Sequence, residues 1–339
     1  MPNEFFYDGV VAAHAQANSN HVSGQDTSSY VLGVDIGGTN LRLALADMEG
    51  TVRARWACST VGVREAETVV QKTRDGLQAM LKEVSAQPGA LKAVAAGAPG
   101  ITNAEAGVVI ATSYLMGWRN VPLQRMLEDE LQVPAAIDND VNLAALGESW
   151  RGSAKGISDF AFLAIGTGIG AGIFLNGRLY RGHNWTAGEI GYMLVPGAPA
   201  EGKRPNEPGI LEATIGGEGI RQHWEACADR TLPASLTATQ IFDHACKGDP
   251  AARALLVHTS RLLARAIYNI SLVLDLPLCV LGGTVGMHEA LLEATLEELA
   301  ALNLRNQPRL LRSIFGPEAQ ITGALCLALD TAGALAPID

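Results

Sequence analysis

Basic residues are scarce in this chain, and none occurs near its beginning. Lysine and arginine number 25 against 35 aspartates and glutamates, so the formal net charge is -10 at pH 7, and the first basic residue is Arg42. An acidic surface repels phosphate backbones, which argues against a nucleic-acid-binding protein. Residues 1–29 also lack the basic n-region of a secretory signal. We therefore expect a cytoplasmic protein.

Cysteine pairs and long apolar runs are also missing. The five cysteines are scattered and odd in number, with no CxxC pair, which is typical of reduced thiols and not of a disulfide or metal framework. No apolar run approaches the roughly 18 residues of a membrane-spanning helix. With 48% hydrophobic and 18% charged residues, the composition is globular, and we expect no membrane partner.

A repeated strand and turn pattern begins at Tyr30. Before it, residues 1–29 are polar, and we expect a flexible extension with a short helix around residues 10–17. YVLGVDIGGTNLRLALADMEGTVRARW predicts three strands, separated by a glycine turn and a turn at Glu49–Gly50. FAFLAIGTGIGAGIFLNGRLYRG repeats this pattern, with its second turn at Asn176–Gly177. The repeat predicts two lobes of similar topology that face one another.

Helical periodicity and buried strands fill the remaining chain. Apolar spacing predicts helices over residues 66–87, 122–132, 141–150, 250–275, 287–302 and 318–334. LKAVAAGAPG, VPAAID and LCVLGG predict further buried strands. We therefore predict an α/β protein with two lobes, each a mixed β-sheet flanked by helices. The first lobe covers residues 30–140 and is completed by a C-terminal helix within residues 318–337, and the second lobe covers residues 141–317.

The glycine-rich turns are candidates for binding an anion. GTGIGAG matches the loose dinucleotide fingerprint GxGxxG/A through Gly166, Gly168 and Ala171, but a hairpin signal follows where that fingerprint requires a helix. No P-loop motif is present. Each glycine turn could be a simple tight hairpin, yet successive backbone N–H groups in such turns can also approach an anion. Two matching turns, together with LGGTVG after another buried strand, favour a nucleotide cleft.

Two carboxylates flank an asparagine in the stretch IDNDVNLAALGE. Asp138, Asn139 and Asp140 directly precede a predicted helix. A helix N-terminus favours the ionised form of a carboxylate, so we expect Asp140 to be deprotonated and able to accept a proton. Either aspartate could instead be the helix N-cap. We assign that role to Asp138.

Seven motifs carry a resemblance to a known family. DIGGT, GAPG, NDxN, GTGIGAG, AGEIG, GILEA and LGGT occur in the order seen in ROK-family sugar kinases, over about residues 30–337. Those kinases belong to the actin-like/hexokinase superfamily of ATPases, with a ribonuclease H-like fold in each lobe. The resemblance implies a glucokinase-like enzyme that uses Mg-ATP to phosphorylate a hydroxyl of a hexose or similar sugar. It also suggests a homodimer.

The resemblance implies a role for particular residues. The first two glycine turns would hold the ATP phosphates through Gly37, Gly38, Thr39, Gly166, Thr167 and Gly168. Gly282 and Gly283 would lie near the adenosine, and Asp35 would reach Mg²⁺ through water. Asp140 matches the NDxN aspartate, which implies a general base for the sugar hydroxyl. The implied sugar-binding residues are Asn139, Glu189, Glu212 and Tyr192.

The sequence departs from the family pattern beside the sugar-binding motifs. The family usually has EIGH and then a CxCGxxGC segment, which together supply a structural zinc site. Here Tyr192 replaces the histidine, and LVPGAPAEGKRPNEPGILEA has no cysteine, so we predict no zinc. Tyr114 likewise replaces a usual asparagine in SYLMGW. These changes imply a shifted sugar preference or weakened catalysis.

Two other kinds of protein compete with the kinase interpretation. One is a catalytically weak sugar-binding or regulatory protein, which the altered sugar loop suggests. The other is a ROK transcription factor, which carries a helix-turn-helix domain before the first glycine turn. Only 29 residues, none of them basic, precede Tyr30, and this argues against DNA binding.

Overall fold

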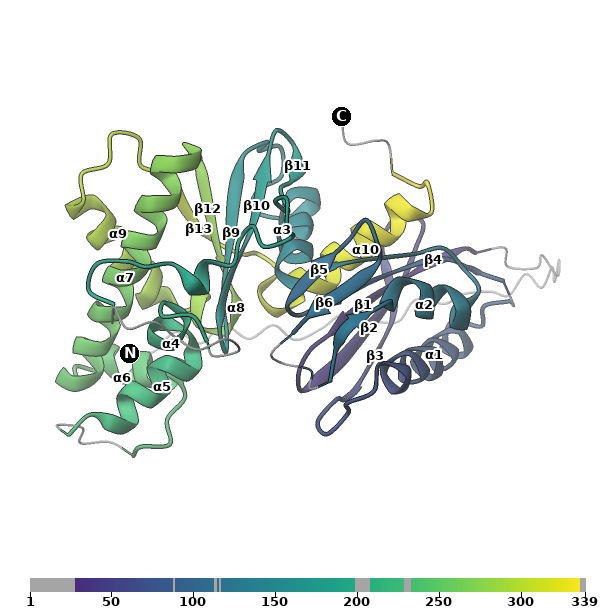
Figure 1. The fold of residues 1–339 in the computed structure, drawn as a ribbon, viewed down its shortest axis with the longest axis horizontal. Coiled ribbons are helices and arrows are strands. Elements are labelled where there is room, and N and C mark those ends of the chain that lie inside the picture. The colour runs from purple at the N-terminus through teal and green to yellow at the C-terminus, as the bar shows by residue number, and fades with distance from the viewer. Residues whose placement is uncertain are drawn as a thin grey trace, which may run out of the picture.

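The computed structural model describes residues 28–87, 89–112, 115, 117–198, 208–228 and 233–335. The helix expected near residues 10–17 and Tyr114 therefore lie outside the described residues. Two five-stranded sheets form the centres of two lobes, as the sequence predicted (Figure 1). No helix in the described ranges is long and apolar enough to cross a membrane.

The first sheet contains the DIGGTN turn, which joins its inner strands β1 and β2. Its order is β3-β2-β1-β4-β8, and β1 pairs antiparallel with β2 and parallel with β4. Every residue of β1 is buried because helices cover both faces of the sheet. The strands are β1 (Tyr30–Ile36), β2 (Asn40–Asp47), β3 (Val52–Ser59), β4 (Leu91–Ala98) and β8 (Ala135–Asn139).

The second sheet repeats the strand order and directions of the first. Its order is β11-β10-β9-β12-β13, with β9 antiparallel to β10 and parallel to β12. The repeat that the two strand–turn–strand stretches predicted is therefore confirmed at the level of topology. The strands are β9 (Phe160–Ile165), β10 (Ile169–Leu175), β11 (Arg178–Leu179), β12 (Leu278–Gly282) and β13 (Arg309–Arg312).

The long helices lie close to their predicted positions. They are α1 (Ala66–Glu83), α2 (Leu123–Leu131), α3 (Asp140–Arg151), α7 (Pro250–Leu274), α9 (Glu289–Ala301) and α10 (Ala319–Thr331). The sequence pattern placed the end of α1 four residues too late, because Ser85 adopts a left-handed conformation that stops the helix. Helix α7 begins at Pro250 after the Asp249 side chain caps it, as the proline predicts.

Several short elements were not predicted. They are the edge strand β13, the small sheet β5 (Ile101–Asn103), β6 (Val108–Ala111) and β7 (Arg119–Val121), and the helices α4 (Glu212–Ile215), α5 (Gly217–Ala226), α6 (Ala238–Cys246) and α8 (Gly283–Gly286), with the 3-10 turns η1 (Ile190–Tyr192) and η2 (Gly316–Glu318). Segments of three or four residues carry too little periodicity to be distinguished from loops. Helices α5 and α6, with 10 and 9 residues, are as long as the predicted helix α2 and were missed for another reason.

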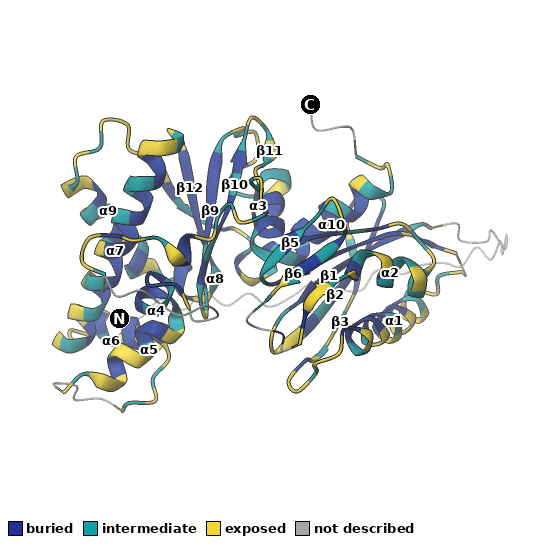
Figure 2. Cartoon of the chain, viewed as in Figure 1, coloured by how far each residue is buried: buried dark blue, intermediate teal, exposed yellow. Residues whose placement is uncertain are grey.

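Helices α3 and α10 form a layer between the two sheets (Figure 1). One face of α10 packs on the first sheet through Ile321 and Leu325, while Ala324 and Cys326 join the core of α3 and the second sheet. The outer faces of the sheets are covered by α1 and α2 on the first lobe and by α5, α6, α7 and α9 on the second. Figure 2 shows both sheets buried within this arrangement. The lobe boundary at residues 140 and 141 stays a prediction.

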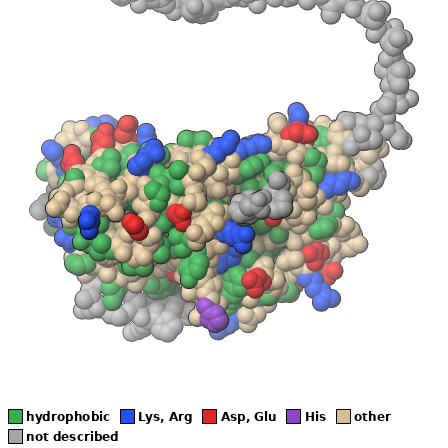
Figure 3. Space-filling model, turned by 90° about the horizontal axis from the view of Figure 1, so that it is seen from above, with side chains coloured by type: hydrophobic (Ala, Val, Ile, Leu, Met, Phe, Trp, Pro, Cys, Tyr) green, Lys and Arg blue, Asp and Glu red, His purple; other side chains and the backbone are tan. Residues whose placement is uncertain are grey.

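Charged side chains of both signs are scattered over one face of the molecule (Figure 3). On the face seen in Figure 3, Lys, Arg, Asp and Glu are interspersed among hydrophobic side chains. On the described part of that face, the surplus of acidic residues is therefore not gathered into a single patch. The carboxylates that do gather are those at the junction of the two lobes.

Candidate active site

The first glycine turn connects β1 to β2. Its ends are held together by the Gly37 amide, which donates to the carbonyl of Asn40 at 2.8 Å, and the Gly37 carbonyl accepts from Thr60 Oγ1 at 2.8 Å. Gly38 and Thr39 at its tip are exposed. The turn therefore presents backbone groups to an approaching ligand, with little side-chain bulk.

The second glycine turn connects β9 to β10 and is fastened to α5. The Gly166 carbonyl accepts from the Gly217 amide at 2.8 Å, and the Thr167 carbonyl accepts from the Glu218 amide at 3.1 Å. A Cβ atom on Gly217 would lie 2.5 Å from the Gly166 oxygen, so only glycine allows this approach. The contact places the GTG turn against the beginning of a helix that the sequence analysis did not predict.

A pocket of about 200 Å³ opens beside the second turn. Its lining comes from the turn and from the beginnings of α5, α6 and α8, namely Gly166, Thr167, Gly217, Glu218, Arg221, Thr237, Ala238, Thr239, Thr284 and Val285. A larger hollow of about 640 Å³ lies at the far end of β2 around Asp47, away from both glycine turns. The smaller pocket adjoins the turn that the sequence analysis assigned to a nucleotide, and that assignment stays a prediction.

Sequence reasoning missed most of that pocket. The GGEG run at residues 216–219 was the available signal, because successive glycines indicate close backbone packing. Gly282 and Gly283 directly precede Thr284, which lines the pocket. Both are closely packed, since a Cβ on Gly282 would meet the Phe162 ring at 2.2 Å and one on Gly283 would lie 2.4 Å from the Ile165 oxygen. Their place near the adenosine stays a prediction.

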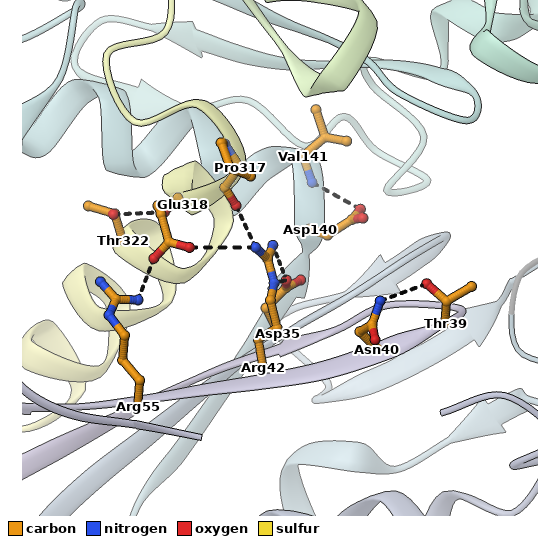
Figure 4. A network of polar contacts seen from close by, with 10 residues as sticks. All are labelled: Asp35, Thr39, Asn40, Arg42, Arg55, Asp140, Val141, Pro317, Glu318 and Thr322. Atoms are coloured by element: carbon orange, nitrogen blue, oxygen red, sulfur yellow. Dashed lines mark hydrogen bonds and ion pairs between the residues drawn. The ribbon is translucent and has the colours of Figure 1, made fainter. Parts of the chain in front are cut away.

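Asp35 lies at the end of β1 and forms an ion pair with Arg42. Arg42 Nε donates to Oδ2 of Asp35 at 2.7 Å, and Nη2 forms an ion pair with the same oxygen at 2.5 Å (Figure 4). Arg42 also donates to the carbonyl of Pro317 at 2.8 Å and lies 3.7 Å from Glu318, which in turn pairs with Arg55. Burial raises the pKa of Asp35 above its usual value, and Arg42 opposes that rise.

Arg42 was also missed by sequence reasoning, although a signal existed. Asp35 and Arg42 are direct partners in the β1–β2 register. Side chains of directly paired residues lie on the same face of a sheet. The predicted hairpin could therefore have identified this pair, but only if the register of its two strands had been known.

Asp140 begins α3, and the pKa of its carboxyl group is raised. Burial, followed by the charge of Asp35, raises its pKa to about 7, and Glu189 adds to that rise, while a hydrogen bond from the Val141 amide at 3.0 Å opposes it. The helix N-terminus therefore does not keep the pKa of Asp140 low, as the sequence analysis expected, because burial and neighbouring carboxylates outweigh the helix. Its side chain still retains some exposure.

The N-cap of α3 is Asn139, so the assignment of that role to Asp138 is wrong. Asn139 Oδ1 accepts from the amides of Val141 at 2.9 Å and Asn142 at 3.1 Å, and its Nδ2 donates to the Gly100 carbonyl at 2.8 Å. The cap falls on Asn139 because β8 continues through this residue in an extended conformation. One amide hydrogen remains available, and the sugar-binding role of Asn139 stays a prediction.

Three further predicted residues lie close enough to influence one another. The pKa of Glu189 is raised by burial and by the charge of Glu212, and that of Tyr192 is raised by burial and by both glutamates. Glu212 Oε2 accepts from the Ile169 amide at 3.1 Å, directly after the second glycine turn. The structure thus brings Glu189, Glu212 and Tyr192 together and places Glu189 within electrostatic reach of Asp140.

The described residues contain no group of three or more His, Cys, Asp or Glu side chains arranged to hold a metal ion. Residues 199–207 of the loop that replaces the zinc motif lie outside them. For Mg²⁺, Asp35 fits an oxygen-ligand role, since it is a buried carboxylate within electrostatic reach of Asp140.

Comparison with known proteins identifies the family of this chain. The ROK family profile matches residues 31–331. The chain is 32% identical to the glucokinase of Halalkalibacterium halodurans, over 76% of this chain and 80% of that protein. It is 32% identical to the N-acetylmannosamine kinase of Citrobacter koseri, over 88% of this chain and 98% of that protein. The ROK hexokinase structure from Thermus thermophilus matches with a TM-score of 0.73 and 29% identity, over 88% and 97% of the chains.

Proposed function

The chain belongs to the ROK family and is a sugar kinase, and from this premise we propose that it transfers the γ-phosphoryl group of ATP to a hydroxyl of a hexose or hexose-like sugar, with Asp140 as general base. The two-lobed actin-like fold expected from the motifs is confirmed by the likeness to ROK kinase structures. The observation that carries the proposal is the position of Asp140, within electrostatic reach of both Asp35 and Glu189.

The residues divide into two groups with different tasks. Gly37, Gly38, Thr39 and Gly166, Thr167, Gly168 offer backbone groups to the phosphates, which need charge neutralisation more than covalent help. Mg²⁺ bound with the triphosphate would add to that neutralisation, and Asp35 would hold it through water. Glu189, Glu212 and Asn139 would accept and donate hydrogen bonds to the sugar hydroxyls.

Proton transfer falls to Asp140. A carboxylate with a pKa near 7 is about half ionised at neutral pH, and its conjugate acid is weak enough for it to accept a proton effectively. The phosphoryl acceptor would be the hydroxyl that lies within hydrogen-bonding distance of this carboxylate. Closure of the lobes would exclude water, which otherwise competes as acceptor.

The test is a coupled ADP-release assay with Mg-ATP and a panel of glucose, mannose, fructose, allose, N-acetylglucosamine and N-acetylmannosamine. We expect turnover with at least one of them. Asp140→Asn should lower kcat on the best sugar by about 10²- to 10⁴-fold, because it removes the base and keeps the shape. Asp129→Asn, an exposed change on α2, is the matched control and should leave kcat unchanged.

The same assay separates the kinase from a sugar-binding regulatory protein. Sugar binding measured by calorimetry, without ADP release from any sugar in the panel, would favour the regulatory alternative. Turnover that Asp140→Asn leaves intact would remove the base assignment while retaining the kinase.

A further inference from the structure

An ion pair between a buried aspartate and a partly exposed arginine joins the two polypeptide segments that carry the site's carboxylates. Asp138 is 0% exposed, and its Oδ2 accepts from Arg181 Nε at 2.8 Å and from Arg181 Nη2 at 2.6 Å. Asp138 is the penultimate residue of β8 in the first sheet, whereas Arg181 follows β11 of the second sheet. The sequence analysis gave neither residue a part in the reaction.

The Asp138 end of the pair holds the turn that presents Asp140. The other carboxylate oxygen, Oδ1, accepts from the Asn139 amide at 2.8 Å and from Asn142 Nδ2 at 2.9 Å. Asp138 therefore binds the N-cap residue and the first turn of α3 together. Asp140 lies between these two contacts, so its backbone position depends on them.

The Arg181 end holds the loop that presents Glu189. The Arg181 carbonyl accepts from the Ala187 amide at 3.2 Å, and the Glu189 amide donates to the Thr186 carbonyl at 3.3 Å. The loop is also fixed to β10, because the Gly188 carbonyl accepts from the Ala171 amide at 2.8 Å. A Cβ on Gly188 would lie 1.9 Å from the Ala171 oxygen, which shows how closely the loop is packed there.

Asp140 and Glu189 have charges of the same sign, so electrostatic repulsion favours their separation. The segments that carry them are connected through a fork of two charge-assisted hydrogen bonds, which fixes direction as well as distance. Helix α3 and the loop are therefore held together by an ion pair, in which Arg181 supplies a positive charge near the two carboxylates.

We propose that Asp138 and Arg181 form a positioning pair, which sets the placement of Asp140 relative to Glu189 and so aligns the acceptor sugar with the base. This inference rests on the proposed sugar kinase activity and deepens it. Neither side chain takes part in proton transfer. Their effect on turnover is transmitted through the turn at Asn139 and the loop at residues 181–189.

The chain contains a matched control for this arrangement. At the far end of β2, Arg53 donates from Nε at 2.7 Å and approaches with Nη2 at 2.6 Å, both to Oδ2 of Asp47. Asp47 also accepts from the amides of Glu49 and Thr51, as Asp138 does from Asn139. This second pair likewise brings Nε and Nη2 of an arginine to one carboxylate oxygen, but it is more exposed and lies at the opposite end of β2 from the first glycine turn.

The experiment compares Arg181→Lys with Arg53→Lys in the full chain. Lysine keeps the charge but lacks the planar fork. For Arg181→Lys we expect kcat/KM for the sugar to fall about 10- to 100-fold, because small misplacements of reacting groups are costly, while KM for Mg-ATP stays within about twofold. Arg53→Lys should leave both constants unchanged. Circular dichroism at the assay temperature verifies that each variant is folded.

Asp138→Asn is the second variant, used if Arg181→Lys does not fold. It removes the charge and keeps an acceptor, and it should produce the same selective loss toward the sugar. Wild-type constants in the folded variant, or a KM for Mg-ATP that rises as much as kcat/KM for the sugar falls, would overturn the positioning role alone. A wild-type protein that phosphorylates no sugar in the panel would overturn the proposed function, and this inference with it.

Discussion

At the residue scale, the acidity of Asp140 leads to a pH dependence. Its pKa is raised to about 7, and only the ionised form can accept the proton. As the pH falls through 7, Asp140 becomes protonated, so kcat/KM for the sugar should fall about tenfold per pH unit below that value and level off above it. A pH–rate profile from 5.5 to 8.5 measures this. A flat profile over that range would contradict the assignment. The residual activity of Asp140→Asn should not show the fall in kcat/KM below pH 7.

Arg42 provides a second test at the residue scale. Its removal would leave the carboxylate of Asp35, which is only 9% exposed, without its cation. We expect Arg42→Gln to lower the free energy of unfolding by about 2 kcal/mol, less than for a fully buried pair because Arg42 is partly solvated. The control is Arg55→Gln, which loses only an exposed contact to Glu318 and should cost less than about 1 kcal/mol. Equal costs, measured by urea denaturation at pH 7.5, would contradict this reasoning.

At the scale of elements, the crossing of α3 and α10 depends on two glycines. A Cβ on Gly323 would lie 1.6 Å from the Leu143 carbonyl oxygen, and one on Gly147 would lie 2.7 Å from that of Ala319. Backbone cannot yield as a flexible side chain can, so α10 would have to move away from α3. Because α10 also packs on the first sheet, that movement would disturb the layer between the lobes.

We therefore expect Gly323→Ala to destabilise the protein by about 3 kcal/mol, at the upper end of overpacking costs. Gly286→Ala on α8 is the control, since the nearest atom to its new Cβ would be 3.5 Å away, an ordinary contact. Thermal and chemical denaturation of both variants measure the difference. A Gly323→Ala protein as stable as the Gly286→Ala protein would show that the two helices can separate without cost.

At the scale of the whole molecule, the two sheets have the same topology, and the first hairpin of each lies at the junction of the lobes. The turns at residues 36–40 and 165–169 are equivalent points of the two sheets, β1–β2 and β9–β10. The carboxylates Asp35, Asp140, Glu189 and Glu212 gather beside them. The site therefore belongs to neither lobe alone.

Metal dependence is predicted at the same scale. Because the four zinc ligands usual in the family are missing together from the sequence, we expect EDTA to leave Tm unchanged and the purified protein to contain less than about 0.1 zinc per chain. Activity should vanish with EDTA and return on addition of excess Mg²⁺ alone. Stoichiometric zinc by elemental analysis, or a fall in Tm with chelator, would contradict the prediction.

The sequence by itself determined the features that depend on local chemistry. Alternating apolar residues and glycine turns located the hairpins, helical spacing located α1, α7 and α10, and the ordered motifs identified the family. Those signals succeed because hydrogen bonding within a strand pair or helix depends mainly on neighbouring residues. Short elements such as α4 and β5 were missed for the same reason, since they are stabilised by distant contacts.

Only the tertiary structure decided how the residues of the site act. Asn139 and not Asp138 caps α3 because β8 runs one residue further than the motif indicated. The pKa of Asp140 is set by burial and by Asp35, which is more than a hundred residues away in the chain. Arg181 reaches Asp138 only after both sheets have folded. Desolvation, charge and hydrogen bonds act through space, so residue order alone does not specify them.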